Sequence, residues 1–183
     1  MALTAELLKD AALLVIDFPD QPRKIWTADN ILPVYVEEGF GLDELNDAQR
    51  HIHEVAMPNA LKLTAGFRRR HLPCVFVHWE DRKVPPAFAP RDGEAVVGKT
   101  AMDAFGSSRI EQVLAEIGPR VLWACGGHTK GCLGETASSA LRRGYIVICV
   151  RDATFDCSQR RWPTGIDAVG YSAVCDSADV LAL

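Results

Sequence analysis

A glycine-rich stretch at residues 121–136 contains a candidate cysteine nucleophile: Val-Leu-Trp-Ala-Cys-Gly-Gly-His-Thr-Lys-Gly-Cys-Leu-Gly-Glu-Thr. The stretch opens with an apolar run typical of a buried parallel strand, and residues 135–143 form a predicted helix with Gly144 as its C-cap. Cys132 therefore lies close to the first turn of a helix, where unpaired N–H groups favour a thiolate over a thiol. A buried structural cysteine beside a helix cap is the alternative interpretation.

Two charged residues, Asp17 and Lys99, are expected beside Cys132. Each of the three closes or follows a predicted strand, and the carboxyl ends of parallel strands share one edge of a sheet. A carboxylate at that edge can take the proton of the thiol, and an ammonium group can stabilise the thiolate. Taken singly, Asp17 could cap a helix and Lys99 could be a surface charge. Their shared edge favours a nucleophilic site.

The elements that must position these residues alternate between strands and helices. Strands are predicted at residues 12–17, 74–78, 94–97, 120–125 and 145–150, with a sixth at 180–183. After a short N-terminal helix, helices are predicted at residues 45–70 (kinked near Pro58), 107–117, 135–143 and 163–175. This alternation predicts an α/β fold with a doubly wound (Rossmann-like), mostly parallel sheet of five or six strands and helices on both faces. We expect residues 1–183 to form a single domain.

Two long irregular segments, residues 18–46 and 81–92, interrupt this alternation, and such loops often act as lids, binding loops or interface arms. Aromatic and imidazole side chains occur in or beside irregular segments near the strand ends. Some of them are candidates for a substrate pocket, although the core or a subunit interface is the alternative for each. The candidate pocket residues are Phe18, Trp26, His78, Trp79 and Phe155.

Composition sets the broad class of protein. The chain has 183 residues, of which 48% are hydrophobic and 24% charged, as in ordinary globular proteins. Its net charge of −4 gives no electrostatic reason to expect nucleic acid. The apolar run at residues 11–16 is too short to cross a membrane and lacks a signal-peptide cleavage site, so we expect a cytoplasmic protein. Its six cysteines should then be reduced thiols.

The sequence also resembles a known family, the isochorismatase-like cysteine hydrolase superfamily, over nearly its whole length. Four ordered blocks carry the resemblance: Ala-Leu-Leu-Val-Ile-Asp at 12–17, Lys-Thr-Ala-Met-Asp-Ala-Phe-Gly-Ser-Ser at 99–108, Gly-His-Thr-Lys-Gly-Cys at 127–132, and the helix and strand that follow, as far as Asp152-Ala153. The first three blocks contain the family's aspartate, lysine and cysteine.

The resemblance implies a mechanism. Asp17 would act as base and then as acid, Lys99 would stabilise charge, and Cys132 would form a thioester with the substrate. The backbone N–H groups of His128 and Cys132 would hold the oxyanion, and a cis peptide bond would precede His128. The resemblance further implies a homo-oligomer, either a dimer or a tetramer.

Departures from the family pattern bear on the substrate. The Thr129-x-Gly131-Cys132 form resembles the N-carbamoylsarcosine amidase and maleamate amidase branch, and isochorismatases proper lack the cysteine. The resemblance therefore implies hydrolysis of a small carboxamide or N-carbamoyl (ureide) compound. Pro19 replaces a glutamine that is common in the family, and His78 lacks the second histidine of the zinc nicotinamidases. We therefore expect no metal and no cofactor, with a metal-dependent nicotinamidase as the alternative.

Two further alternatives remain open. Residues 93–100, from Gly93 to Thr100, match the P-loop pattern G-x-x-x-x-G-K-[ST], which would indicate a nucleotide-binding protein. However, a P-loop follows a strand and opens a helix, whereas residues 94–97 are themselves a predicted strand. The second alternative is a catalytically silent member of the family that serves as a scaffold; the presence of Asp17, Lys99 and Cys132 counts against it.

Overall fold

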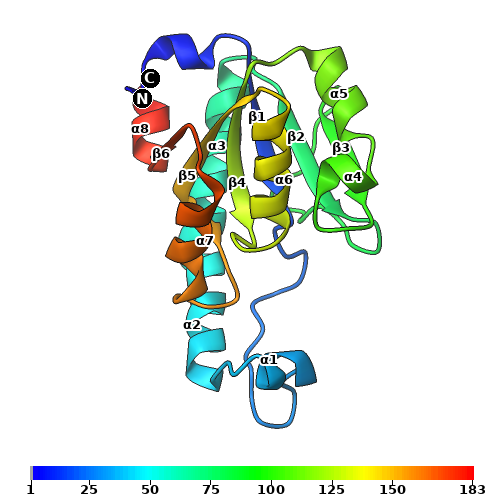
Figure 1. Cartoon of the computed structure of the whole chain (residues 1–183), viewed down its shortest axis with the longest axis vertical. Coiled ribbons are helices and arrows are strands. Elements are labelled where there is room, and N and C mark those ends of the chain that lie inside the picture. Colours follow the sequence, from blue (N-terminus) through cyan, green and yellow to red (C-terminus); the bar gives the residue numbers. More distant parts are fainter. Residues whose placement is uncertain (1) are drawn as a thin grey trace.

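A computed structural model describes residues 2–183 as a six-stranded, all-parallel sheet with helices on both faces (Figure 1). The strand order is β3-β2-β1-β4-β5-β6. The strands are β1 (Ala11–Ile16), β2 (Cys74–Trp79), β3 (Ala95–Lys99), β4 (Val121–Gly127), β5 (Ile146–Phe155) and β6 (Ala173–Cys175). This arrangement confirms the predicted doubly wound α/β fold.

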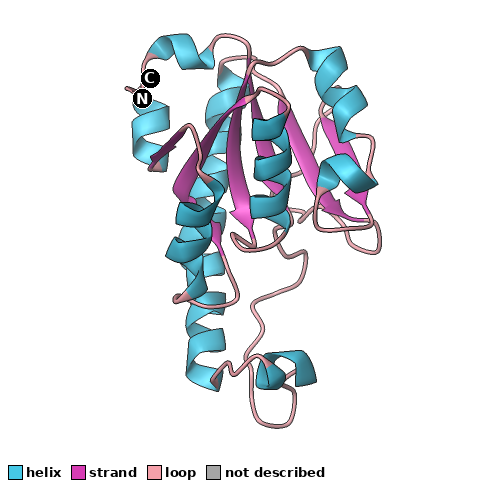
Figure 2. Cartoon of the chain, viewed as in Figure 1, coloured by secondary structure: helices cyan, strands magenta, loops and turns pink. Residues whose placement is uncertain are grey.

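The helices fall on two sides of this sheet, as Figure 2 shows. They are α1 (Pro33–Glu37), α2 (Leu42–His51), α3 (Met57–Arg69), α4 (Ala104–Ser107), α5 (Ile110–Ile117), α6 (Cys132–Arg142), α7 (Arg161–Val169) and α8 (Ser177–Ala182), with a 3₁₀ helix at Ala5–Leu8. A π-helical segment, Ile52–Ala56, joins α2 to α3 just before Pro58. The long helix predicted at 45–70 is therefore confirmed in outline and begins three residues earlier.

Strand β1 lies at the centre of the core because both of its faces are covered. All six of its residues are buried, which is typical of a strand in a doubly wound sheet. Leu13 and Val15 pack with Leu63 and Phe67 of α3 on one face. Leu14 and Ile16 pack on the other face with residues of α5 and α6. The order of the strands reverses between β1 and β4, so the carboxyl ends of these two strands flank the position where such sheets bind ligands.

The C-terminal prediction was wrong in two places. Helix α7 ends at Val169 because Gly170, at φ +70°, adopts the left-handed conformation of a helix C-cap. The residues that follow form β6, which pairs with β5, and not the end of a helix. Residues 180–183, predicted as the sixth strand, instead belong mostly to α8, which opens with a capping box at Asp176.

Residues 18–41, here called the arm, leave the carboxyl edge of the sheet directly after Asp17 and carry α1 beyond the strand ends (Figure 1). The arm has a small apolar cluster of its own, in which Trp26 and Phe40 are buried against Leu45 and Cys157. The ring of Tyr35 contacts the edges of both aromatic side chains. The predicted irregular segment is thus an ordered extension that packs against α2 and the residues after β5.

Candidate active site

Lys99, the last residue of β3, connects the three predicted site residues. Its side chain is fully buried, and Nζ lies 2.9 Å from Asp17 Oδ2, 3.1 Å from Cys132 Sγ and 3.2 Å from the carbonyl oxygen of Ala101. These three acceptors match the three N–H donors of an ammonium group. The ring of Trp79 lies beneath the ammonium, with Nζ 3.8 Å from its centroid. The structure therefore brings Lys99 into contact with both Asp17 and Cys132.

Asp17 presents a buried carboxylate with unused capacity to accept a proton. The residue has φ +51°, an uncommon value for a side chain other than glycine, and this turn directs the chain out of β1. Apart from the ion pair with Lys99, neither carboxylate oxygen has a hydrogen-bond partner within residues 2–183. A carboxylate in this setting can serve as a base toward the neighbouring thiol.

Cys132 is the first residue of α6 and is 8% exposed. Burial, together with the negative charge of Asp17, raises the pKa of the Cys132 thiol to about 11, although Lys99 acts in the opposite direction. This outcome differs from the expected thiolate, because burial and the negative charge of Asp17 outweigh the contact with Lys99. Near pH 7 the Cys132 side chain is consequently a thiol, and a reaction at its sulfur would need a base.

The loop between β4 and α6 is shaped by two glycines. Gly126 has φ +110°, and a Cβ there would collide with the backbone of Ile16 on the adjacent strand. A Cβ on Gly127 would meet the ring of Phe155. The chain can therefore approach β1 and β5 closely before it turns toward Cys132.

Two backbone N–H groups of this loop are available to a ligand. The peptide bond between Gly127 and His128 is cis. In the described chain, the N–H groups of His128 and Cys132 donate to no protein acceptor, whereas the carbonyl oxygen of His128 accepts from Gly131 and Leu133. The N-cap of α6 is Gly131, whose lack of a side chain leaves the first turn without a side-chain cap. Unpaired N–H groups at a helix N-terminus can stabilise a developing negative charge.

The proposed pocket residues divide into two groups. Trp79 contacts Lys99, and Phe155 lies between Phe18 and His128, so these aromatic side chains line or support the site. Burial lowers the pKa of His128, so its imidazole is neutral near pH 7. Trp26, in contrast, lies in the apolar cluster of the arm and is not brought to Cys132.

His78 lies at the edge of a small cavity away from the thiol. Its Nδ1 is 2.8 Å from the carbonyl oxygen of Trp79. The cavity, of about 10 Å³, also contacts Phe18, Val77 and Pro85. This volume suits a single water molecule rather than a substrate. No group of three or more His, Cys, Asp or Glu side chains within residues 2–183 is arranged to hold a metal ion, and independence from metal stays a prediction.

The P-loop alternative does not fit the structure. Most of the segment from Gly93 to Thr100 is strand β3, so Lys99 extends from a strand and reaches Asp17. A phosphate-binding loop needs successive N–H groups in a turn that opens a helix. The hollow beside Gly93, about 500 Å³ in volume, lies at the amino ends of β2 and β3, opposite the catalytic edge.

Asp156 is a site residue that sequence reasoning missed. It follows β5 directly and its side chain is fully buried. It accepts a hydrogen bond from the backbone N–H of Lys130, in the loop at residues 128–131 between β4 and α6, here called the nucleophile loop. The predicted strand ended at residue 150, five residues before Phe155, so the sequence pattern did not place Asp156 at the carboxyl edge of the sheet.

Comparison with known proteins places this geometry in a family. The family model described as "Isochorismatase domain" matches residues 11–179. A relative from Verticillium dahliae, described as "Secreted isochorismatase effector Isc1", is 28% identical over 142 residues, which cover 69% of this chain and 73% of the relative.

No helix of the described residues is long and apolar enough to span a bilayer.

Solved structures show the same fold at low sequence identity. An isochorismatase-like hydrolase from Alkaliphilus metalliredigens is 20% identical with a TM-score of 0.71, covering 94% of this chain and 96% of that one. A cysteine hydrolase from Pseudomonas syringae is 15% identical with a TM-score of 0.72, covering 98% and 93%. These structures share the fold of this chain, and because the family model matches most of the sequence, the protein belongs to the isochorismatase domain family.

Proposed function

We propose that the chain is a cysteine hydrolase that cleaves the C–N bond of a small carboxamide or N-carbamoyl compound. The observation that carries this proposal is the placement of Lys99 Nζ, 2.9 Å from Asp17 Oδ2 and 3.1 Å from Cys132 Sγ. A thiol, a base and a buried cation together provide what covalent attack on a carbonyl carbon requires.

The first half of the reaction forms a thioester. Because the Cys132 thiol has a pKa of about 11, its proton moves to Asp17 as the sulfur attacks the carbonyl carbon. The carbonyl oxygen becomes negative, and the free N–H groups of His128 and Cys132 stabilise it. The C–N bond then breaks, and Asp17 returns the proton to the departing ammonia or amine.

The second half releases the acid. Water attacks the thioester carbon, Asp17 accepts a proton from that water, and the C–S bond breaks. The thiolate leaves beside Lys99 and regains its proton from Asp17. Each cycle therefore consumes one water and restores the thiol.

A screen of small carboxamides and N-carbamoyl compounds, with released ammonia as the readout, tests this proposal. We expect at least one compound to release ammonia, and Cys132→Ala to abolish the release while the fold is retained. Turnover that survives in Cys132→Ala would contradict the role of the thiol.

A second candidate follows from the name of the Verticillium dahliae relative, which is that of an isochorismatase. Isochorismate carries a vinyl ether, so its hydrolysis would release pyruvate and no ammonia. A pyruvate assay with isochorismate separates the two candidates. Pyruvate release that is unaffected by Cys132→Ala would favour the isochorismatase.

Oligomerisation is a further part of the proposal. Several apolar side chains of the arm are exposed, including Ile25 at 67% and Val36 at 58%, and exposed apolar surface favours association. We expect a dimer or tetramer, which light scattering coupled to gel filtration would measure. A monomer at micromolar concentration would contradict this part alone.

A cytoplasmic location is also proposed. All six cysteines are free thiols, as expected for a reducing compartment. The relative described as a secreted effector makes the opposite location worth measuring. Cell fractionation with detection of the native chain would distinguish the two.

A further inference from the structure

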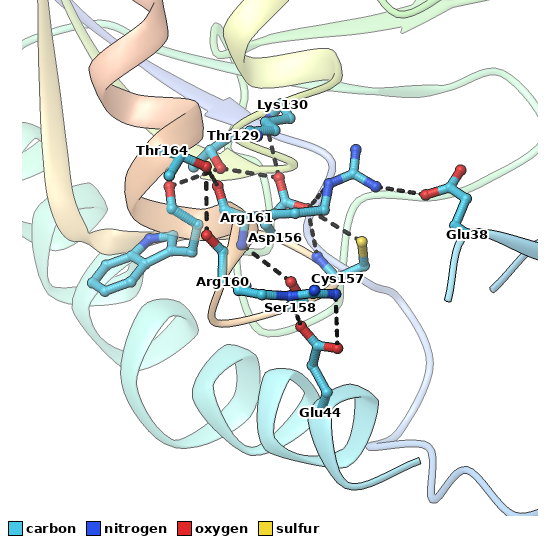
Figure 3. A network of polar contacts seen from close by, with 11 residues as sticks. Glu38, Glu44, Thr129, Lys130, Asp156, Cys157, Ser158, Arg160, Arg161 and Thr164 are labelled. Carbon is cyan, nitrogen blue, oxygen red and sulfur yellow. Dashed lines mark hydrogen bonds and ion pairs between the residues drawn. The ribbon is translucent and has the colours of Figure 1, made fainter. Parts of the chain in front are cut away.

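The buried carboxylate of Asp156 holds the middle of the nucleophile loop (Figure 3). Its Oδ2 accepts from the Lys130 N–H at 2.9 Å and lies 2.9 Å from the Thr129 hydroxyl. Its Oδ1 accepts from the N–H of Cys157 at 2.8 Å. One side chain thus joins the end of β5 to the loop that precedes α6.

The two loop residues that Asp156 contacts lie in the sequence between His128 and Cys132, whose N–H groups are assigned to the oxyanion. Thr129 and Lys130 follow His128 and precede Gly131 and Cys132. The N–H of Thr129 also donates to the carbonyl oxygen of Phe155 at 3.0 Å, so the loop is attached to β5 at successive residues. A shift at Thr129 or Lys130 would therefore change the relative orientation of the two outer N–H groups.

Asp156 acts on this loop as an anion. Burial opposes its charge, but hydrogen bonds from Lys130 and Cys157 lower the pKa of Asp156 overall. An ionised carboxylate only accepts hydrogen bonds, so it can serve the N–H and hydroxyl donors on both of its oxygens. An asparagine in its place would present an NH₂ group to one of those donors.

Arg161 connects the same carboxylate to the arm. Its Nε lies 3.5 Å from Asp156 Oδ1, and its Nη1 donates to Glu38 Oε2 at 2.7 Å (Figure 3). The guanidinium also lies over the ring of Phe40, 5.5 Å from its centroid. A neighbouring pair, Arg160 with Glu44, also joins the start of α7 to α2, but within residues 2–183 neither side chain forms a hydrogen bond or an ion pair with Asp156.

We propose that Asp156 is a positioning residue for the oxyanion site and that Arg161 couples this positioning to the docked arm. The inference rests on the proposed function, because it concerns the N–H groups assigned to the oxyanion. When Glu38 of the arm binds Arg161, the guanidinium of Arg161 also pairs with Asp156, and Asp156 in turn accepts hydrogen bonds from the nucleophile loop. The arm thereby influences catalysis without contacting Cys132.

Two probes of Cys132 test this inference without knowledge of the natural substrate. Acylation by p-nitrophenyl acetate passes through a tetrahedral oxyanion, whereas alkylation by iodoacetamide does not. Asp156→Asn should lower the acylation rate at least about tenfold, since oxyanion donors contribute factors of that size or more. Its alkylation rate should stay within about threefold of wild type, because thiol access and pKa are little changed. A purely structural role would lower both rates together.

Matched variants separate the individual contacts. Thr129→Val should reduce acylation as Asp156→Asn does, and Thr129→Ser, which keeps the hydroxyl, should restore most of the rate. The combined Thr129→Val and Asp156→Asn variant should lose less than the product of the single losses. Arg161→Gln should slow acylation several-fold, with Arg160→Gln as its control. Denaturant midpoints check that each variant is folded.

The outcomes distinguish this inference from the proposed function. Wild-type protein acylated at Cys132, with Asp156→Asn either unchanged or slowed equally toward both probes, would overturn the inference alone. Equal effects of Arg160→Gln and Arg161→Gln would overturn the coupling to the arm. If wild-type protein is alkylated but never acylated at Cys132, the result contradicts the proposed function and, with it, the role of Asp156 that depends on that function.

Discussion

The Lys99 ammonium lies 3.1 Å from the Cys132 sulfur and also forms an ion pair with Asp17. Contact with an ammonium group favours a thiolate over a thiol. Because the sulfur is buried and lies near the negative charge of Asp17, the pKa of the Cys132 thiol instead rises to about 11. Near pH 7 the sulfur of Cys132 is therefore protonated in the absence of a substrate.

This relationship predicts opposite effects of Asp17→Asn on two rates. Removing the negative charge should lower the pKa of Cys132, so alkylation by iodoacetamide at pH 8 should become faster. Amide turnover should fall at least about 100-fold, because the base is lost. In wild-type protein, alkylation should rise about tenfold per pH unit below pH 10, as the thiolate fraction does. Mass mapping must place the label on Cys132, and mainly Cys157 labelling would contradict the assignment.

Lys99→Met should have the reverse effect on the thiol. Without the ammonium, the pKa of Cys132 should rise further, so alkylation at pH 8 should slow, and turnover should fall at least about 100-fold. Lys130→Met is the matched control, because its side chain is exposed on the same loop and only its backbone N–H contacts Asp156. Equal losses in the two variants would indicate damage to the loop and not loss of the buried cation.

The sequence predicted that Asp17, Lys99 and Cys132 lie together because each of them closes or follows a strong apolar run. Asp17, Lys99 and Cys132 share an edge as a consequence of parallel strands, and no side-chain detail is needed to infer it. Asp156 was missed because β5 runs five residues beyond its predicted end, to Phe155, so the carboxylate did not lie at a predicted strand end. The protonation of Cys132 was also missed, since it depends on burial and on a distance between two acidic groups.

The C-terminal errors have a different cause. Strand β6 has three residues, of which Val174 is 45% exposed, so it lacks the apolar run that marks a central strand. Local pattern therefore favoured a continuous helix, and only pairing with β5 makes the segment extended. Trp26 was a candidate pocket residue with burial in a core as the alternative, and the structure shows it buried in the apolar cluster of the arm.

Gly165 in α7 is predicted to be intolerant of a side chain. A Cβ there would collide with the side chain and backbone of Thr129, so Gly165→Ala should push α7 away from the nucleophile loop. We expect a loss of about 1–3 kcal/mol in unfolding free energy, as for other overpacked sites, together with slower acylation of Cys132. The control is Gly106→Ala in α4, where the new Cβ meets nothing closer than 3.7 Å. Similar midpoints for the two variants in urea would refute the collision.

The Arg68–Glu94 pair should contribute stability that depends on pH. The two side chains are only 14% and 13% exposed, and Arg68 Nε and Nη2 each lie 2.7 Å from a Glu94 oxygen. Burial alone would raise the pKa of Glu94, but the hydrogen bonds from Arg68 and from the Arg91 N–H lower it overall. A lowered pKa stabilises the fold above the ordinary value of 4.5, and this contribution is lost as the pH falls below that value.

Glu94→Gln should accordingly cost about 1–3 kcal/mol at pH 7, the range for hydrogen bonds to charged groups, and progressively less toward pH 3. Urea unfolding at several pH values measures this difference. Glu6→Gln is the control: Glu6 pairs with Lys9, both side chains are largely exposed, at 73% and 71%, and the urea midpoint should hardly change at any pH. A Glu94→Gln effect that is constant from pH 7 to pH 3 would exclude the ion pair as its source.

The last prediction concerns metal and substrate together. His78 uses its Nδ1 toward the carbonyl oxygen of Trp79, and a lone imidazole beside carboxylates is a poor zinc site compared with two or three imidazoles. Amide hydrolysis should therefore persist after dialysis against EDTA, and His78→Ala should retain metal-independent turnover. Nicotinamide should be a poor substrate, because nothing but hydrogen bonds and aromatic contacts would orient its ring. Efficient nicotinamide turnover that vanishes with EDTA and returns with zinc would refute this prediction, while the roles of Asp17, Lys99 and Cys132 would remain testable through the alkylation and acylation of Cys132.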